Sequence, residues 1–145
     1  ISEKENMNVK EVLNVLNKKS GVLGLSEVSS DFRDITKAIE EGNEVAKNAL
    51  EVFANTVVRF VGAYVAEMNG VDAIAFTAGV GENNQAVRKM VCEQLGYLGV
   101  SLDEKANEKR REEIMISTPD SKVKVFVIPT NEELAIARET LELLS

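Results

Sequence analysis

The sequence predicts an α/β fold with helices packed on a small sheet. A short apolar run at 73–76 lies between a long helical pattern at 43–68 and a glycine-rich segment that leads into another helix. Two further apolar runs, at 114–116 and 123–128, precede a last helical pattern. Strands that alternate with helices are typical of an α/β layer architecture. With 145 residues, the chain is expected to form one domain with a substantial core.

The N-terminal half is predicted to be helical. Residues 8–18 place apolar side chains at helical spacing, the segment 19–21 ends this helix, and Gly24 keeps the next stretch irregular. The polar triplet 29–31 supplies N-cap side chains for a second helix, which ends at Gly42. The third helix, 43–68, has so wide an apolar face that we expect it to pack on a sheet and to meet another domain or subunit.

The C-terminal half supplies the sheet. The small apolar residues of 72–76 suit a parallel strand that is covered on both faces. A helix is expected from about residue 84 onward, and the polar segment 103–113 is expected to form a short surface helix. Two strands, 114–116 and 123–128, are joined by a turn, and the last helix spans 131–144.

Composition excludes several classes of function. A net charge of −7 argues against broad nucleic-acid binding. The sequence has no histidine, which excludes a histidine base and histidine metal ligands. Its single cysteine, Cys92, excludes an internal disulfide and is expected to be a small buried hydrophobe.

The sequence also gives expectations about the cellular location of the protein and about whether the chain is part of a longer one. No apolar run approaches the length that spans a bilayer and no signal peptide is visible, so we expect a cytoplasmic protein that does not bind membranes. The chain starts at Ile1, without an initiator Met and in a polar segment. We therefore expect a piece of a longer protein that begins in a loop.

The most informative segment is 76–83, Phe-Thr-Ala-Gly-Val-Gly-Glu-Asn. Its position between a strand and a helix is typical of a phosphate or nucleotide site, because glycines let the main chain approach a ligand and a helix start offers free N–H groups. Asn84 replaces the third glycine of a dinucleotide fingerprint, and no Gly-Lys-Ser/Thr of a P-loop follows. From the spacing alone, a tight strand-to-helix turn that binds no ligand is as good an interpretation of this segment as a nucleotide site.

Four segments, in order, resemble the signatures of acetate kinases. They are N-K-K-S-G-V-L-G at 17–24, S-S-D-F-R-D at 29–34, F-T-A-G-V-G-E-N at 76–83 and P-T-N-E-E-L at 129–134. The resemblance covers essentially the whole chain but only the C-terminal third or so of a family member. The one small departure is Ala78, where glycine is frequent in the family.

The resemblance implies a ribonuclease-H-like fold of the actin, sugar kinase and heat-shock ATPase superfamily. Residues 1–145 would form the C-terminal nucleotide-binding part of a two-domain kinase. Family members transfer a phosphoryl group between ATP and acetate with magnesium, and they are homodimers. Their catalytic groups lie in sequence absent here, so we expect no catalytic residue in this chain and no turnover of acetate by it alone. Propionate or butyrate as the acceptor stays open, as does a non-catalytic, actin-like nucleotide-binding or dimerisation module.

The resemblance also assigns nucleotide-binding residues to two segments. They are Asp31, Phe32 and Arg33 in the first, and Gly79, Val80, Gly81, Glu82 and Asn83 in the second. Physically, Phe32 or Arg33 could lie against the adenine and Asp31 could accept a hydrogen bond from ribose or base. The alternative for this segment is a plain helix start with Ser30 as cap and Phe32 in the core. For Asn83 the alternative is an N-cap, which is compatible with ligand contact.

Magnesium is assigned by resemblance to Glu132. The spacing of Thr130 and Glu133 fits a capping box, which would give Glu133 a structural role and leave Glu132 to face the cleft. One carboxylate is too little for a site by itself, since magnesium takes one or two carboxylates together with waters and phosphate oxygens.

Overall fold

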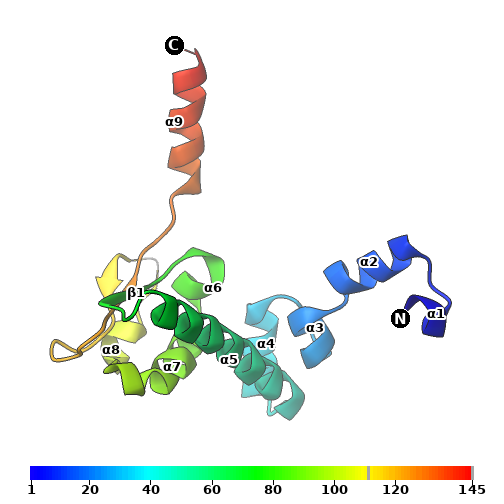
Figure 1. The fold of residues 1–145 in the computed structure, drawn as a ribbon, viewed down its shortest axis with the longest axis horizontal. Coiled ribbons are helices and arrows are strands. Elements are labelled where there is room, and N and C mark those ends of the chain that lie inside the picture. Colours follow the sequence, from blue (N-terminus) through cyan, green and yellow to red (C-terminus); the bar gives the residue numbers. More distant parts are fainter. Residues whose placement is uncertain (111, 145) are drawn as a thin grey trace. The chain divides into compact units, whose positions relative to one another are not determined.

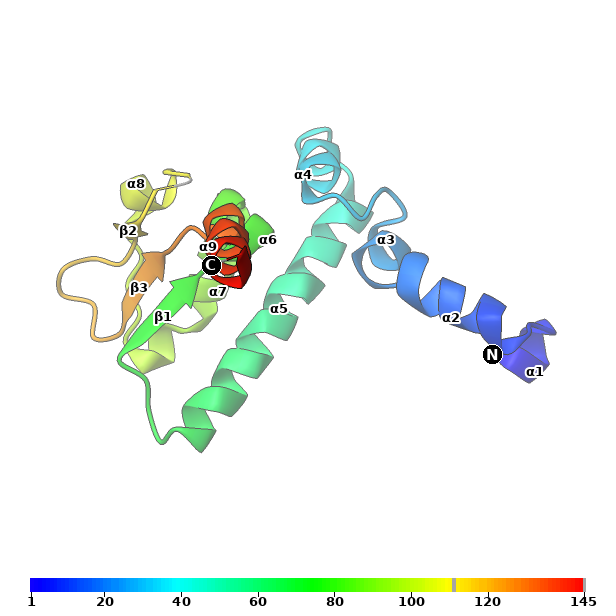
Figure 2. The same cartoon turned by 90° about the horizontal axis from the view of Figure 1, so that it is seen from above.

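The computed structural model describes residues 1–110 and 112–144. It divides into two compact units, Ile1–Gly62 and Ala63–Ser145, which we describe separately. Figures 1 and 2 show the order of the elements in two views. The first unit is helical, and the second contains the sheet.

The first unit begins with three helices, α1 (Ser2–Glu5), α2 (Val9–Lys18) and α3 (Gly21–Ser26). A capping box starts α2: the Asn8 side chain accepts from the Glu11 N–H at 3.0 Å, and the Glu11 carboxylate accepts from the Asn8 N–H at 2.8 Å. The expectation that Gly24 keeps the stretch after the first helix irregular is wrong, because α3 occupies it. A Cβ at Gly24 would lie 3.0 Å from the Lys19 carbonyl oxygen, so the glycine lets α3 pack closely behind α2.

Helices α4 (Phe32–Glu40) and α5 (Glu44–Glu67) form the core of the first unit. Ile35 of α4 is fully buried, and the rings of Phe32 and Phe53 meet edge to face with centroids 4.7 Å apart. The buried face of α5 consists of Ala46, Ala49, Leu50 and Ala54. These helices confirm the two predicted at 31–41 and 43–68.

Most of the apolar surface of α5, the long helix in Figure 2, is exposed. The large exposed side chains are Val45, Val52, Phe60 and Tyr64 of α5, and Met68 directly after it. With 24 residues and a mean hydropathy of 1.3 over its most apolar 18 residues, α5 is long and apolar enough to cross a membrane by length and composition only. The reason is that its polar side chains follow one narrow line. Length and composition alone do not separate such a span from an apolar helix that packs against protein.

The second unit contains a three-stranded sheet in the order β1-β3-β2, visible in Figure 2. Strand β1 (Ala73–Phe76) pairs in parallel with β3 (Lys124–Val127), with Phe76 opposite Val127. Strand β2 (Ile114–Met115) pairs antiparallel with β3. All three strands confirm the sequence prediction, including the parallel direction of β1. Ala73 and Ala75 are nevertheless exposed, so β1 is not covered on both faces here.

Among its described residues, the second unit also contains α6 (Ala78–Asn83), α7 (Gln85–Gln94), the 3₁₀ helix η1 (Gly96–Leu98), α8 (Glu104–Asn107) and α9 (Glu132–Leu144). The core combines side chains of the sheet and α7 with the residues that directly follow β2 and α7, namely Phe76, Val87, Val91, Leu95, Ile116, Val125 and Val127. Helix α8 is shorter than the predicted helix at 103–113, of which Arg111 lies outside the described residues. The predicted last helix is confirmed as α9, which is exposed throughout its described length.

Candidate functional site

The glycine motif forms a short helix rather than the expected loop. Strand β1 ends at Phe76, Thr77 is extended, and Ala78 adopts a φ of +58°, which turns the chain directly into α6. The helix expected near residue 84 is a second one, α7, whose N-cap Asn84 accepts from the Val87 N–H at 3.0 Å. A left-handed conformation costs a residue with a Cβ roughly 1–2 kcal/mol, so the alanine at this position carries backbone strain.

The two glycines of α6 serve different purposes. A Cβ at Gly81 would lie 3.3 Å from the main-chain carbonyl carbon of Phe76, so Gly81 allows α6 to pack against the end of β1. A Cβ at Gly79 would meet nothing within 4 Å. The main chain at Gly79 therefore stays open for a ligand, whereas Gly81 is required by packing.

Gly79 lines a cavity of about 520 Å³ at the carboxyl ends of β1 and β3. Its lining residues are Ala78, Gly79, Thr130, Asn131, Glu132 and Glu133. The two strands are joined at this edge by the Ile128 N–H, which donates to the Phe76 carbonyl at 2.9 Å. Crevices outside the carboxyl ends of parallel strands are the usual ligand sites of α/β sheets. The structure thus brings together two of the segments singled out in the sequence, 76–83 and 129–134.

Glu82 connects the two walls of this cavity. Its carboxylate is buried, and the oxygen Oε1 accepts from the Thr130 N–H at 2.8 Å and from the Thr130 hydroxyl at 2.9 Å. Glu82 is not a lining residue. The geometry therefore gives it a part in holding α6 against the segment before α9, a role that the sequence did not indicate.

Asn83 and Val80 complete the motif. The Asn83 side-chain amide donates to the Gly79 carbonyl at 2.9 Å, which closes the single turn of α6 on itself. The alternative of Asn83 as an N-cap is wrong, because Asn84 caps α7. Val80 is half-buried.

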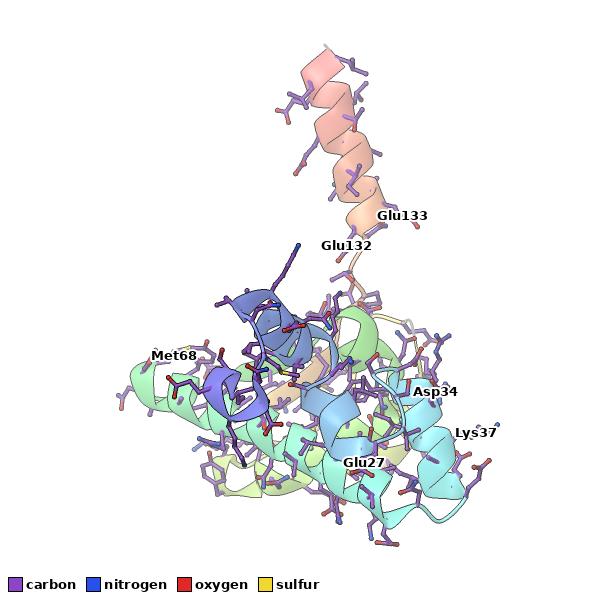
Figure 3. All side chains as sticks on the ribbon, turned by 90° about the vertical axis from the view of Figure 1, so that its right-hand side faces the viewer. Glu27, Asp34, Lys37, Met68, Glu132 and Glu133 are labelled. Carbon is purple, nitrogen blue, oxygen red and sulfur yellow. The ribbon has the colours of Figure 1, made fainter. Side chains whose placement is uncertain are left out.

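The start of α9 differs from the predicted capping box. Asn131 is the cap, since its side-chain oxygen accepts from the Leu134 N–H at 3.0 Å, while the Thr130 hydroxyl is bonded to Glu82. Glu133 therefore has no capping role in the structure, and the predicted difference between a structural Glu133 and a metal-binding Glu132 does not follow from the cap. Both carboxylates are exposed, both line the cavity, and Figure 3 shows both at the first turn of α9.

Asp31, Phe32 and Arg33 lie in the first unit, at the start of α4. Asp31, rather than Ser30, caps this helix by accepting from the Arg33 N–H at 2.9 Å. The Arg33 guanidinium also donates to both oxygens of Asp31, and the pair lowers the pKa of Asp31 to about 2. Phe32 packs on Phe53, as the helix-start alternative expects. Arg33 has a side chain that is 90% exposed and is accessible to a ligand.

Arg88 is an important residue that the sequence interpretation missed. It is fully buried in α7, and its guanidinium donates to the carbonyls of Gly81 and Glu82 in α6, both at 2.9 Å. It also donates to the Asn107 side chain at 2.8 Å and to main-chain oxygens of Asn107 and Lys109. A sequence signal existed, because a charged residue between Val87 and Val91 interrupts the inward face of a predicted helix.

Cys92 is the buried hydrophobe that the sequence predicts. Its side chain is 3% exposed, and burial raises the pKa of the thiol to about 12. A thiol with such a pKa is protonated at neutral pH and is a poor nucleophile.

Comparisons with known proteins agree with this geometry. The family model described as "Acetokinase family" matches residues 1–138. The acetate kinase of Lachnoclostridium phytofermentans is 60% identical over 144 residues, which are 99% of this chain and 36% of that protein. The chain therefore spans about a third of the length of the curated relatives it matches.

Solved structures show the same relationship. The crystal structure of Porphyromonas gingivalis acetate kinase is 46% identical, with a TM-score of 0.90 over 99% of this chain and 36% of that one. A propionate kinase from Francisella tularensis is 38% identical, with a TM-score of 0.85 over 96% of this chain and 35% of that one. These likenesses confirm the predicted fold class. Because the family model covers nearly all of the sequence, the chain belongs to the Acetokinase family.

Proposed function

We propose that this chain is the C-terminal ATP-binding part of an acetate kinase, which transfers a phosphoryl group between ATP and acetate. The cavity beside Gly79 carries the proposal. It is assembled from two segments that are about fifty residues apart in sequence, and each of them resembles a family signature. A ligand site is the simplest reason for both signatures to line one cavity.

In the proposed site, Gly79 lets the main chain approach the nucleotide, and Gly81, Glu82 and Asn83 keep α6 in place around it. Val80 lies within the same turn. The segment of Asp31, Phe32 and Arg33 is proposed to contribute to adenosine binding. The exposed Arg33 guanidinium is the best suited of the three for stacking on a base, because Phe32 is already packed on Phe53 and Asp31 caps α4.

Magnesium fits the donors at the start of α9. Among residues 1–110 and 112–144 there is no group of three or more acidic, cysteine or histidine side chains that could form a metal cage. A nucleotide-bound magnesium does not need one, since one or two carboxylates and phosphate oxygens are enough. Glu132, with Glu133 as a second candidate, would hold the ion, which neutralises charge on the phosphates when bound.

Phosphoryl transfer depends on positioning and charge neutralisation rather than on covalent help from the protein. The chain described here offers a nucleotide wall and acidic groups for the metal. We therefore expect residues 1–145 alone to form no acetyl phosphate from ATP and acetate. Detection of acetyl phosphate above the level of a heat-denatured sample would contradict this.

A chimera tests the proposed role directly. The matching 144 residues of the Lachnoclostridium phytofermentans acetate kinase would be replaced by this chain, whose 60% identity should allow it to fold there. We expect ATP-dependent acetyl phosphate formation with a KM for ATP near that of the parent. A chimera that unfolds cooperatively like the parent but no longer binds ATP would contradict the proposal.

Propionate is a second candidate acceptor, and the likeness to the Francisella tularensis propionate kinase favours it specifically. The acceptor pocket is proposed to lie outside the 145 residues, so this chain does not decide between the acids. Steady-state rates with acetate, propionate and butyrate on a full-length protein that carries this sequence would identify the acceptor. We further propose a homodimer, supported by the exposed apolar side chains of α5, and a cytoplasmic location, supported by the likeness to acetate kinases.

A further inference from the structure

Arg88 is a buried cation whose hydrogen bonds join α6, the helix that lines the cavity, to Asn107 and Lys109. All five of its N–H groups are used, and each donates to a neutral oxygen: two carbonyls of α6, the side chain and main chain of Asn107, and the carbonyl of Lys109. We propose that Arg88 is a positioning residue for nucleotide binding, which holds α6 so that Gly79 faces the ligand. This inference rests on the proposed function.

Helix α6 needs such support because it is only six residues long. Isolated helices of that length are unstable in water, since nucleation fixes several residues for each hydrogen bond gained. The last carbonyls of a helix lack partners within it and carry partial negative charge. Arg88 donates to two of these carbonyls, those of Gly81 and Glu82, and so satisfies the end of α6 with a positive charge.

Stability alone does not explain a guanidinium at this position. Removing a charge from water is unfavourable, and burial lowers the pKa of Arg88. An apolar side chain of similar volume often serves as well in a core, whereas a guanidinium fixes the direction of its acceptors. Arg88 therefore fixes the positions of the two α6 carbonyls that accept from it.

Asn107 fixes Arg88 from the other side. Its side-chain oxygen accepts from Arg88 Nε at 2.8 Å, and its amide group donates to the Gln85 carbonyl at 3.0 Å. Asn107 is itself 3% exposed, at the end of α8. A chain of buried hydrogen bonds therefore runs from α8 through Arg88 to α6, at whose first turn Gly79 lines the cavity.

The test measures the affinity of the 145-residue chain for Mg·ADP by ¹⁵N NMR, together with amide exchange in α6 and the melting temperature. Arg88→Met removes the hydrogen bonds of the guanidinium. Arg88→Lys keeps the positive charge and most of the side-chain length but has fewer N–H donors. Asn107→Ala removes the side-chain oxygen that accepts from Arg88 Nε. Two control variants lie on the same helix. Lys89→Met removes the neighbouring outward-facing cation, and Val91→Ala lowers stability without touching Arg88.

We expect Arg88→Met to speed exchange of the amides of Gly81 to Asn83 and to raise the Kd for Mg·ADP roughly tenfold, the factor that follows if a tenth of the molecules keep α6 formed. Arg88→Lys and Asn107→Ala should fall between Arg88→Met and the wild type. Val91→Ala should lower the melting temperature but keep the wild-type Kd, and Lys89→Met should change neither appreciably.

Three results would overturn the inference. The first is an unchanged Kd in Arg88→Met with a lowered melting temperature, and the second is a Kd in Val91→Ala that rises as much as in Arg88→Met. The third result applies if Arg88→Met fails to fold: the Kd for Mg·ADP is then that of the wild type in both Arg88→Lys and Asn107→Ala. A wild-type chain that does not bind Mg·ADP at all would instead contradict the proposed function, so the two failures are distinguishable.

Discussion

At the scale of single residues, the pair Gly79 and Gly81 separates ligand binding from packing. Gly79→Ala places a methyl group in open space at the cavity, and alanine is the better helix former by about 1 kcal/mol. We expect unchanged or higher stability in urea with weaker ATP binding. Gly81→Ala forces a Cβ to within 3.3 Å of the Phe76 main chain and should lower the free energy of unfolding by about 1–3 kcal/mol. Equal losses of stability in both variants would contradict this assignment.

The Asp31 carboxylate predicts a pH dependence at the start of α4. Its pKa falls from 3.8 to about 2, chiefly through the hydrogen bond from the Arg33 side chain. A lowered pKa in the folded state means that the contribution of Asp31 to stability is complete above about pH 4 and is lost as the pH falls through about 2. An NMR titration of the Asp31 side chain should give the low pKa, and Asp31→Asn, which still caps the helix, should lose this pH dependence. A midpoint near 3.8 would contradict the pairing.

At the scale of elements, the contact between α6 and the start of α9 shapes the cavity. Thr130→Val removes the hydroxyl that donates to Glu82 but keeps the side-chain shape, so we expect a loss of about 1–3 kcal/mol in the free energy of unfolding. Thr130→Ser keeps the hydroxyl and is the matched control, with a loss of less than about 1 kcal/mol. The comparison uses urea unfolding of both variants. Equal stability of the valine and serine variants would show that the hydroxyl does not join the two elements.

Most elements could be predicted from sequence because periodicity, caps and turn residues agree along the chain. The long α5 followed from a wide apolar face at helical spacing, and the parallel β1 from an uninterrupted run of small apolar residues. Helix α6 could not be predicted, because its two glycines indicate a loop. Arg88 donates to the last carbonyls of α6, and its contacts lie up to 21 residues away along the chain, which local patterns do not reveal. Likewise, the cap of α9 shifted to Asn131 because Thr130 is engaged by Glu82, 48 residues earlier in the sequence.

At the scale of the whole molecule, the exposed side of α5 predicts self-association. Phe60 and Tyr64 of α5 are 61% and 57% exposed. Exposed apolar patches of this kind mark protein–protein interfaces. We expect sedimentation equilibrium to give twice the chain mass of 15.9 kDa, and Phe60→Glu to give the monomer. A wild-type chain that stays monomeric at all accessible concentrations would contradict dimerisation through this helix.

The central claim is that the cavity beside Gly79 binds a nucleotide, and titration of the ¹⁵N-labelled chain with Mg·ATP tests it most directly. We predict saturable shifts of the amides of Gly79 and of residues 130–133, with smaller shifts around Phe32 and Arg33. Gly79→Ala should weaken these shifts without loss of fold. Saturable binding that leaves the amides of Gly79 and 130–133 unmoved, or no shift at any nucleotide concentration, would contradict the account.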